Sequence, residues 1–347
     1  MSSAHHYCML LQEHVSLKDL NTFGIHAQAR YYIRINDAQC LHDFLLHKKL
    51  QPLPRLILGG GSNLLFLNDF KGIVIHMAIG GIATIREDRA HVWVKAGAGV
   101  DWHTLVLHCV EHGYAGIENL SLIPGTVGAA PMQNIGAYGV TLSEVFESLE
   151  AMEIHSGEVR TFGREDCAFG YRDSIFRGTL KEQYIILSVT LSLQKKPIFR
   201  TTYGALQDTL QTMNVQELSI KAMSDAVIYI RQNKLPDPAL LGNAGSFFKN
   251  PILTQQQFEK LKRTHPNMPG YAQPKGQVKV PAAWLIEQCG WKGKKRGAVG
   301  VHKQQALVLV NYGDGTGREV YQLARDIQQS VKDLFSIEIM PEVNLIS

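Results

Sequence analysis

The alternation of apolar and polar residues in the first half of the chain predicts short strands that end at turn residues. Three such runs span 55–58, 72–76 and 91–96. Between Leu149 and Phe162 the pattern predicts a hairpin that turns at Ser156-Gly157. Helical spacing is clearest after Asp101, an expected N-cap, and continues until Gly113. This mixture indicates an α+β fold.

The last third of the chain has longer helical patterns. A helix predicted around 218–232 ends in Lys234-Leu-Pro-Asp-Pro238, because neither proline can continue it. The other predicted elements are a helix from Pro281 to Gly290, a buried strand over 305–311, an amphipathic helix over 320–334 and a terminal strand. We expect a compact βα domain that packs over the first-half domain, with a cleft between them.

The composition is that of an ordinary globular protein of two or three domains, since 45% of the 347 residues are hydrophobic and 19% charged. The net charge of +4 comes from scattered lysines and arginines, which argues against nucleic acid and suits a small anionic substrate. No metal-ligand cluster, signal peptide or membrane-spanning apolar run stands out. An odd number of cysteines without a Cys-x-x-Cys pair favours a reducing cytoplasm: Cys8, Cys40, Cys109, Cys167 and Cys289.

The first glycine-rich segment, 59–63, follows a predicted strand and precedes the apolar Leu64. Its residues are Gly59, Gly60, Gly61, Ser62 and Asn63. Successive small-residue amides form a concave nest for a phosphate. The lysine-hydroxyl pair of a P-loop is missing, and Leu64 stands where the Rossmann pattern has its third glycine. We therefore expect strand, loop and strand, with a plain glycine hairpin as the alternative.

The second glycine-rich segment, 123–139, is longer and offers close backbone approach to an extended ligand. Side chains at Gln133 and Asn134 add donors and acceptors, and Tyr138 adds an aromatic edge. Such a segment fits a cofactor with a pyrophosphate and a flat ring, although a close-packed turn over a core is the alternative. The candidate binding residues are Pro124, Gly125, Thr126, Gly128, Ala129, Gln133, Asn134, Gly136, Ala137, Tyr138 and Gly139.

A single hydroxyl, that of Ser246, lies between glycines and two aromatic rings. Gly245 permits a positive φ or close ligand approach, while Phe247 and Phe248 are expected to exclude water from a dry site around the hydroxyl. A turn whose serine caps a helix is the alternative.

Several motifs in order resemble the UDP-N-acetylenolpyruvoylglucosamine reductase family, also called UDP-N-acetylmuramate dehydrogenase. Besides the two glycine-rich segments and the Ser246 segment, which is 242–251, these motifs are 21–24, 171–174, 283–289, 302–308 and 341–343. The resemblance implies an FAD-binding domain of the vanillyl-alcohol-oxidase type over 1–215, in two subdomains of about 1–72 and 73–215. It also implies a C-terminal α/β substrate-binding domain over 216–347, whose last strand returns to the active site.

The family's reaction implies a role for each candidate catalytic residue. NADPH reduces noncovalently bound FAD, and the flavin then reduces an enolpyruvyl ether to a lactyl ether in peptidoglycan precursor synthesis. The resemblance makes Ser246 the proton donor, Arg172 the neutraliser of the developing enolate and Glu342 the group that orients or polarises it. Alternatives are a surface ion pair of Arg172 with Asp173, and a solvated strand end at Glu342.

The resemblance also implies residues that contact the UDP-sugar: Tyr203, Lys234, Asn250 and Gln305. The tyrosine in Thr202-Tyr203-Gly204 is typical of the family's tyrosine-containing form. The sequence ends at Ser347, five residues after Glu342, so we expect it to lack the longer tail of some family members. We expect a cytoplasmic monomer without a membrane partner.

Three other functions stay open at this point. A flavin oxidase would share the glycine-rich segments but would not need Ser246 or Glu342. An acyl-transfer enzyme would use Ser246 as nucleophile, but no Gly-x-Ser-x-Gly elbow surrounds it. A non-catalytic nucleotide-binding module is the third possibility, and such a protein would not convert any substrate to product.

Overall fold

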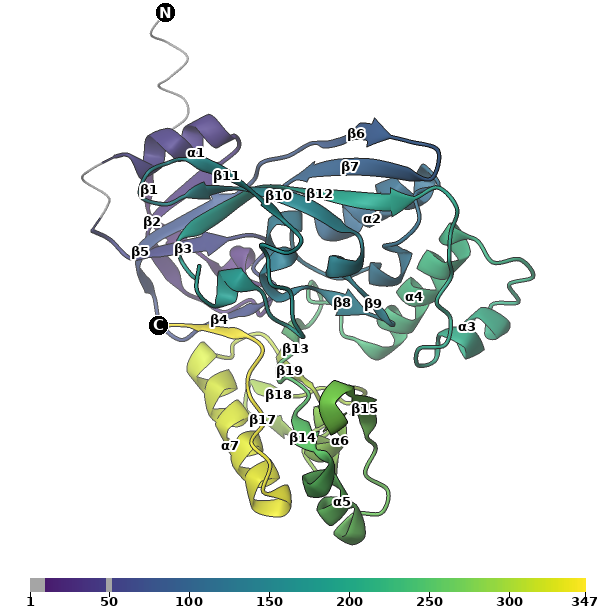
Figure 1. Ribbon diagram of the computed structural model, residues 1–347. Coiled ribbons are helices and arrows are strands. Elements are labelled where there is room, and N and C mark those ends of the chain that lie inside the picture. Colours follow the sequence, from purple (N-terminus) through teal and green to yellow (C-terminus); the bar gives the residue numbers. More distant parts are fainter. Residues whose placement is uncertain (1–9, 48–51) are drawn as a thin grey trace, which may run out of the picture. The chain divides into compact units, whose positions relative to one another are not determined.

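The computed structural model describes residues 10–47 and 52–347, so Cys8 lies outside the described residues (Figure 1). Contacts divide the chain into two compact units. The first contains the residues up to Val15, 29–60 and 71–233, and the second contains 16–28, 61–70 and 234–347. The domain boundary after residue 215 remains a prediction, while the division by contacts falls at Asn233.

The first unit contains a four-stranded sheet near its beginning, in the order β1-β2-β5-β3. These strands are β1 (Gln12–Ser16), β2 (Gln28–Ile35), β5 (Phe70–Met77) and β3 (Arg55–Leu58). Helix α1 (Ala38–Leu45) is capped by Asp37, whose carboxylate accepts from the Cys40 amide. Its apolar face packs with the aliphatic residues of β2 and β5, including Ile33 and Ile75.

A five-stranded antiparallel sheet forms the larger part of the first unit, in the order β11-β10-β12-β7-β6. The strands are β11 (Val159–Gly163), β10 (Phe146–Glu153), β12 (Tyr184–Gln194), β7 (His91–Gly97) and β6 (Ile82–Glu87). The predicted hairpin is confirmed as β10 and β11, and Gly157 in its turn has a φ of +74°.

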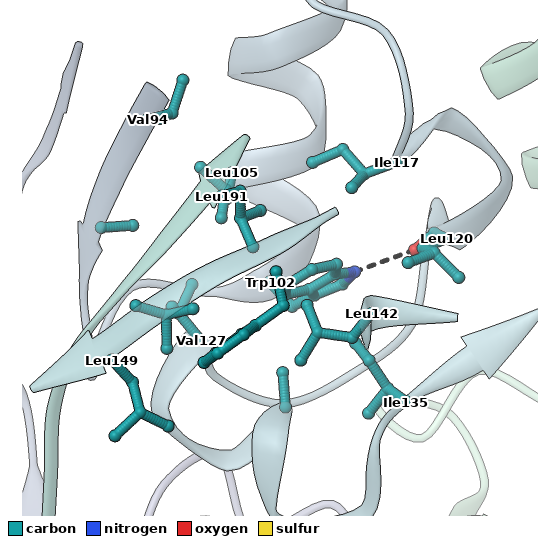
Figure 2. Close-up of a cluster of buried hydrophobic side chains, with 14 of the residues drawn as sticks. Val94, Trp102, Leu105, Ile117, Leu120, Val127, Ile135, Leu142, Leu149 and Leu191 are labelled. Atoms are coloured by element: carbon teal, nitrogen blue, oxygen red, sulfur yellow. Dashed lines mark hydrogen bonds between the residues drawn. The ribbon is translucent and has the colours of Figure 1, made fainter. Parts of the chain in front are cut away.

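Helix α2 (Trp102–Glu111) confirms the helix expected after Asp101, whose carboxylate accepts from the Thr104 amide. Gly113, with a φ of +72°, follows its end. Figure 2 shows Trp102 within the buried cluster that α2 shares with the sheet, its indole N–H donating to the Leu120 carbonyl at 3.0 Å. The paired N–H lets the large ring sit in an apolar core without an unsatisfied donor.

The remaining elements of the first unit are short, apart from its last helix. They are β8 (Gly136–Ala137), β9 (Val140–Thr141), α3 (Leu206–Thr212), α4 (Ile220–Lys234) and the 3-10 turns Glu118–Leu120, Val127–Ala129, Pro131–Gln133, Leu142–Glu144 and Ile175–Arg177. The helix predicted over 218–232 is thus confirmed as α4. Its buried residues, among them Met223 and Val227, form a separate cluster with α3.

The second unit is built around a four-stranded antiparallel sheet in the order β13-β19-β18-β17. Its strands are β13 (Gly242–Ser246), β19 (Val308–Asn311), β18 (Val299–Val301) and β17 (Lys295–Arg296). The strand predicted over 305–311 begins only at Val308, because the Val308 amide donates to the Gln305 carbonyl and closes a turn. The amphipathic helix is confirmed as α7 (Gly317–Phe335), with Thr316 and Glu319 forming a capping box.

Two smaller sheets complete the second unit. One joins β14 (Ile252–Thr254), β16 (Gln277–Lys279) and β15 (Tyr271–Gln273), next to α5 (Gln255–Thr264). In the other, the terminal strand β20 (Asn344–Ile346) pairs in parallel with β4 (Leu64–Phe66). A short 3-10 turn covers Pro274–Gly276. Helix α6 (Ala282–Gln288) confirms the helix predicted between Pro281 and Gly290.

Within the described residues, no helix is long and apolar enough to cross a membrane. Four cysteines, Cys40, Cys109, Cys167 and Cys289, are free thiols. Burial raises the pKa of Cys109 to about 12, with a smaller contribution from Glu118, so this thiol stays protonated and inert at neutral pH.

Candidate active site

The two glycine-rich segments meet inside the first unit. A Cβ at Gly59 would lie 2.4 Å from the hydroxyl oxygen of Thr126, and one at Gly60 would lie 3.0 Å from the Cα of Gly125. Any side chain at these positions would therefore press one segment out of place. The two backbones can approach because Gly59 and Gly60 have no side chain, and the paired segments are the candidate cradle for a pyrophosphate.

A third segment supports the cradle, and sequence reasoning missed it. Gly128 donates its amide to the Ala98 carbonyl at 2.9 Å, and a Cβ at Gly128 would lie 2.6 Å from the Ala98 methyl. The next bond runs from the Val127 amide to the Val100 carbonyl at 2.8 Å. The signal in the sequence was the Gly-Ala-Gly run that ends β7, at 97–99.

Helix α2 starts directly beside the second glycine-rich segment. The amide of Trp102, its first residue, donates to the Gly125 carbonyl at 2.9 Å, and Asp101 pairs with Thr126. The segment thus lies at the positive end of the α2 dipole, which favours negative charge nearby. Pro124 and Ala129 are exposed on this stretch and Thr126 is part-buried.

The later part of the second glycine-rich segment is held in uncommon backbone conformations. Asn134 and Tyr138 are non-glycine residues with φ values of +43° and +47°. The Asn134 side-chain amide donates to the Ser143 hydroxyl and the Gly170 carbonyl, both at 3.2 Å, while the Gln133 side-chain oxygen accepts from Arg177. Left-handed non-glycine residues persist where the surroundings hold them, and they often mark a functional site.

Arg172 lies against this same segment. It occupies the tip of a tight turn closed by Gly170 and Asp173, with a φ of +53°, and its guanidinium donates to the Gly136 carbonyl at 3.1 Å. The structure therefore brings one predicted catalytic residue to the predicted cofactor-binding residues. Gly136 and Ala137, which form β8, are part-buried beside it.

Arg231 is a second arginine of this site, and the sequence analysis did not include it. Its Nε donates to the Leu122 carbonyl at 3.1 Å, and its guanidinium is hydrogen-bonded to Tyr138. Burial lowers the pKa of Arg231 and raises the pKa of Tyr138. The signal in the sequence was a charged residue on α4, one turn before Lys234.

Tyr203 also belongs to the first unit, where it is 54% exposed. A Cβ at Gly139 would lie 3.4 Å from the Tyr203 Cβ, so the tyrosine rests against a bare stretch of backbone. Lys234, the last residue of α4, is exposed.

In the second unit, Ser246 ends β13 opposite Val308. The residue is exposed, whereas Phe247 and Phe248 are 0% and 1% exposed and stack edge to face within the core. The expectation that the two rings surround the hydroxyl with a dry site was therefore wrong: both rings pack into the core just after β13 ends, and Ser246 stays exposed. The expected positive φ of Gly245 is confirmed at +66°.

Glu342 lies beside the Ser246 segment. Its amide donates to the Phe247 carbonyl at 2.8 Å, and Phe248 forms a bridge with Pro341. Glu342 is 8% exposed, so it is a buried carboxylate and not the solvated strand end that was the alternative. Ser246 and Glu342 are thus neighbours although 96 positions separate them in the sequence.

Two predicted substrate residues of this unit, Asn250 and Gln305, form hydrogen bonds with nearby backbone groups. The Asn250 side-chain oxygen accepts from the Ala282 amide at 2.9 Å, at the start of α6. Gln305 lies in the turn before β19, and Leu307 of that turn accepts the Phe247 amide at 2.8 Å. Asn250 thus lies within the Ser246 segment, and the turn that contains Gln305 is bonded to that segment through Leu307.

The end of the first glycine-rich segment, from Gly61 onward, belongs to the second unit. A Cβ at Gly61, whose φ is +63°, would collide with the Leu20 carbonyl, and the Gly61 carbonyl accepts from the Thr22 amide at 3.1 Å. The Asn63 carbonyl accepts from the backbone and side-chain amides of Asn344. Ser62 lies part-buried between them. The first unit thus gathers Arg172, Tyr203 and most cofactor-binding candidates, and the second gathers Ser246, Glu342, Asn250 and Gln305.

Two family models match the chain. Residues 30–163 match an FAD binding domain, and residues 237–346 match the C-terminal domain of UDP-N-acetylenolpyruvoylglucosamine reductase. A reductase of that name from Amoebophilus asiaticus is 60% identical over 338 residues, covering 97% of this chain and 100% of its own. The chain belongs to the UDP-N-acetylenolpyruvoylglucosamine reductase family.

Other members of the family agree over the full length. The Pseudomonas putida reductase is 47% identical over 96% of this chain and 98% of its own. The crystal structure of the Thermus caldophilus reductase has a TM-score of 0.67 at 23% identity, covering 97% of this chain and all of its own, and so has the same fold. The predicted fold, an FAD-binding domain followed by the family's C-terminal domain, is confirmed.

Proposed function

We propose that this protein reduces the enolpyruvyl group of UDP-N-acetylenolpyruvoylglucosamine to give UDP-N-acetylmuramate, with NADPH as the reductant. The observation that carries the proposal is the close approach of the two glycine-rich segments in a chain that belongs to this reductase family. Small residues suit a dinucleotide site, and here Gly59 and Gly60 let the first segment approach Gly125 and Thr126 of the second.

FAD would be held noncovalently by the two glycine-rich segments and would supply the hydride, which it takes from NADPH. Arg172 is suited to binding the substrate carboxylate, because its guanidinium is already oriented by the Gly136 carbonyl. A fixed positive charge there stabilises negative charge as it develops on the carboxylate side of the reacting double bond.

Ser246 is suited to delivering the proton to carbon. A serine hydroxyl is a weak acid, so it needs a group nearby that makes the loss of its proton tolerable. Glu342 has a separate role, since a second negative charge beside the serine would oppose the loss of its proton. Its backbone amide donates to the Phe247 carbonyl, next to the Ser246 segment, and the residue is buried. We propose that Glu342 orients or polarises the reacting group while Ser246 donates the proton.

Tyr203, Lys234, Asn250 and Gln305 are proposed to bind the sugar nucleotide. Lys234 is exposed at the end of α4, where its ammonium group provides a point charge for a diphosphate. Tyr203 is exposed at the end of an irregular segment, as a lid residue needs to be. The reaction serves peptidoglycan precursor synthesis, and we propose that it takes place in the cytoplasm and that the protein acts as a monomer.

The test is a steady-state assay in which NADPH oxidation is followed with and without the enolpyruvyl sugar nucleotide. We expect oxidation to depend on the sugar nucleotide and to yield a product heavier by two hydrogen atoms in mass spectrometry. Rapid NADPH oxidation that needs oxygen and ignores the sugar nucleotide would instead identify an oxidase.

A further inference from the structure

The tyrosine segment, residues 197–205, has no helix or strand, yet a buried side chain fixes it. Asn119 is 1% exposed, and its side-chain amide donates to the Tyr138 carbonyl at 2.9 Å and to the Arg200 carbonyl at 3.1 Å. One amide group thus connects the second glycine-rich segment to the tyrosine segment. Both of its N–H bonds are used, so the separation of the two backbones is fixed.

The side chain of Arg200 makes a second connection between the same segments. Its guanidinium donates to the Gly139 carbonyl at 3.2 Å and pairs with Glu144 at 2.6 Å. The other carboxylate oxygen of Glu144 accepts from the Thr141 amide at 2.9 Å, so the anion is itself held in place. An isolated exposed ion pair contributes little, but a guanidinium fork with two oriented acceptors fixes geometry as well.

Tyr203 depends on these connections for its position. Only two residues separate it from Arg200, and over half of its surface is exposed. The Tyr203 side chain lies beside Gly139. A Cβ added at Gly139 would be 3.4 Å from the Tyr203 Cβ and 3.7 Å from a carbon of the Tyr203 ring. The carbonyl that Arg200 binds thus belongs to the residue on which Tyr203 rests.

We propose that Arg200 is a positioning residue for the sugar nucleotide: by binding Gly139 and Glu144 it holds Tyr203 in place for the substrate. The inference rests on the proposed function, in which Tyr203 contacts that substrate. Arg200 acts through the tyrosine and does not touch the reacting atoms.

The first experiment compares Arg200→Ala with Arg164→Ala as a matched control. Both arginines line one cavity of about 340 Å³, so each variant removes one positive charge from the same surface. For Arg200→Ala we expect the KM for the sugar nucleotide to rise about 5- to 30-fold, with kcat changed less than about 3-fold. Calorimetric titration with the product nucleotide should show the same loss of affinity.

Arg200→Lys keeps the positive charge but not the fork, and we expect it to recover part of the affinity. Flavin content, melting temperature and the rate of flavin reduction by NADPH should stay at wild-type values in all three variants. A KM in Arg200→Ala equal to that of Arg164→Ala would overturn the inference, as would an equal loss of NADPH reactivity.

The second experiment is a double-mutant cycle with Tyr203→Phe. If Arg200 acts by positioning the Tyr203 hydroxyl for the substrate, Arg200→Ala should change KM less than about 2-fold in the Tyr203→Phe background, which lacks that hydroxyl. Full additivity would show that Arg200 acts on its own and would overturn the inference. Should Tyr203→Phe alone leave KM unchanged, the proposed substrate contact fails and the inference with it. If Tyr203→Phe raises KM but Arg200→Ala does not, the contact between Tyr203 and the substrate is supported and the role of Arg200 is refuted.

Discussion

Gly60 and Gly125 approach each other so closely that a Cβ at position 60 would lie 3.0 Å from the Cα of Gly125. The two residues come from segments 65 positions apart, each of which the sequence marks as a phosphate-binding candidate. Their contact joins the two glycine-rich segments into one candidate cradle. The proposed cofactor site depends on it.

Replacing Gly60 with valine should lower FAD binding sharply while most of the fold is retained. The added side chain presses against Gly125, and overpacking of this kind costs about 1–3 kcal/mol. Gly80→Val is the control, because nothing lies within 4 Å of a Cβ at Gly80. Flavin absorbance after gel filtration with FAD, together with circular dichroism, measures both effects. Equal flavin content in the two variants would contradict the cradle.

Ser246→Ala should leave flavin reduction by NADPH nearly intact and slow the subsequent reaction with the enolpyruvyl substrate. Only that second step needs a proton at carbon, and general acids contribute about 10²- to 10⁴-fold. Ser246→Cys keeps an acidic hydrogen and should recover part of the rate. Single-turnover measurement of each step separates the two, and equal slowing of both would argue against Ser246 as the acid.

Arg172→Lys should be poorly tolerated although the charge is kept. The guanidinium binds the Gly136 carbonyl while its planar fork remains suited to a carboxylate, and an ammonium group cannot reproduce both contacts. We expect kcat to fall by at least about 10-fold with flavin content unchanged. Wild-type turnover in this variant would show that the arginine is peripheral to the reaction.

Lys234→Ala should weaken binding of the sugar nucleotide more than it slows flavin reduction by NADPH. Losing a charge-assisted contact to a diphosphate costs about 1–3 kcal/mol, which would appear mainly in KM. Lys221→Ala on the same helix is a suitable control, because that lysine pairs with Asp225. Binding of the product nucleotide, followed by flavin difference spectra, tests the prediction. Equal affinities of the Lys234→Ala and Lys221→Ala variants would show that Lys234 does not contact the diphosphate.

Protonation of His103 should loosen the start of the second glycine-rich segment. Its Nδ1 accepts the Leu122 amide at 3.0 Å, which requires a neutral ring, and burial together with Arg231 lowers the pKa of His103, partly offset by Asp101. A histidine with a lowered folded pKa destabilises the fold as pH falls through its ordinary pKa of about 6.5, and the effect levels off below the folded pKa.

The measurement is the melting temperature between pH 7.5 and 5, compared with that of His103→Gln. The wild type should lose more stability over this range than the variant, whose side chain does not titrate there. Parallel curves would show that His103 has no part in the pH dependence.

Local elements were predictable because their signals are local. Asp101 as a helix cap, the turn at Gly157 and the helix over 218–232 all follow from side-chain chemistry within a few residues. The strand at Val308 was predicted three residues too long, because the apolar run continues into a turn that only tertiary contacts define.

Long-range features of the site were harder to predict. Arg231 lies on a helix whose pattern reads as ordinary, and its role depends on contacts with Leu122 and Tyr138, over 90 positions away. The burial of Phe247 and Phe248 also depends on tertiary packing, since aromatic rings beside a serine fit a ligand cleft and a core equally well. The resemblance to the family pointed to Ser246 and Glu342, whose proximity no sequence spacing reveals.

An anaerobic spectrum of the purified protein, taken in two steps, tests the proposed flavin reaction most directly. We expect a yellow protein whose flavin absorbance is lost on adding NADPH and returns when the enolpyruvyl sugar nucleotide is added, without oxygen. A protein that cannot be reconstituted with FAD, or whose absorbance returns only on admitting air, would contradict it.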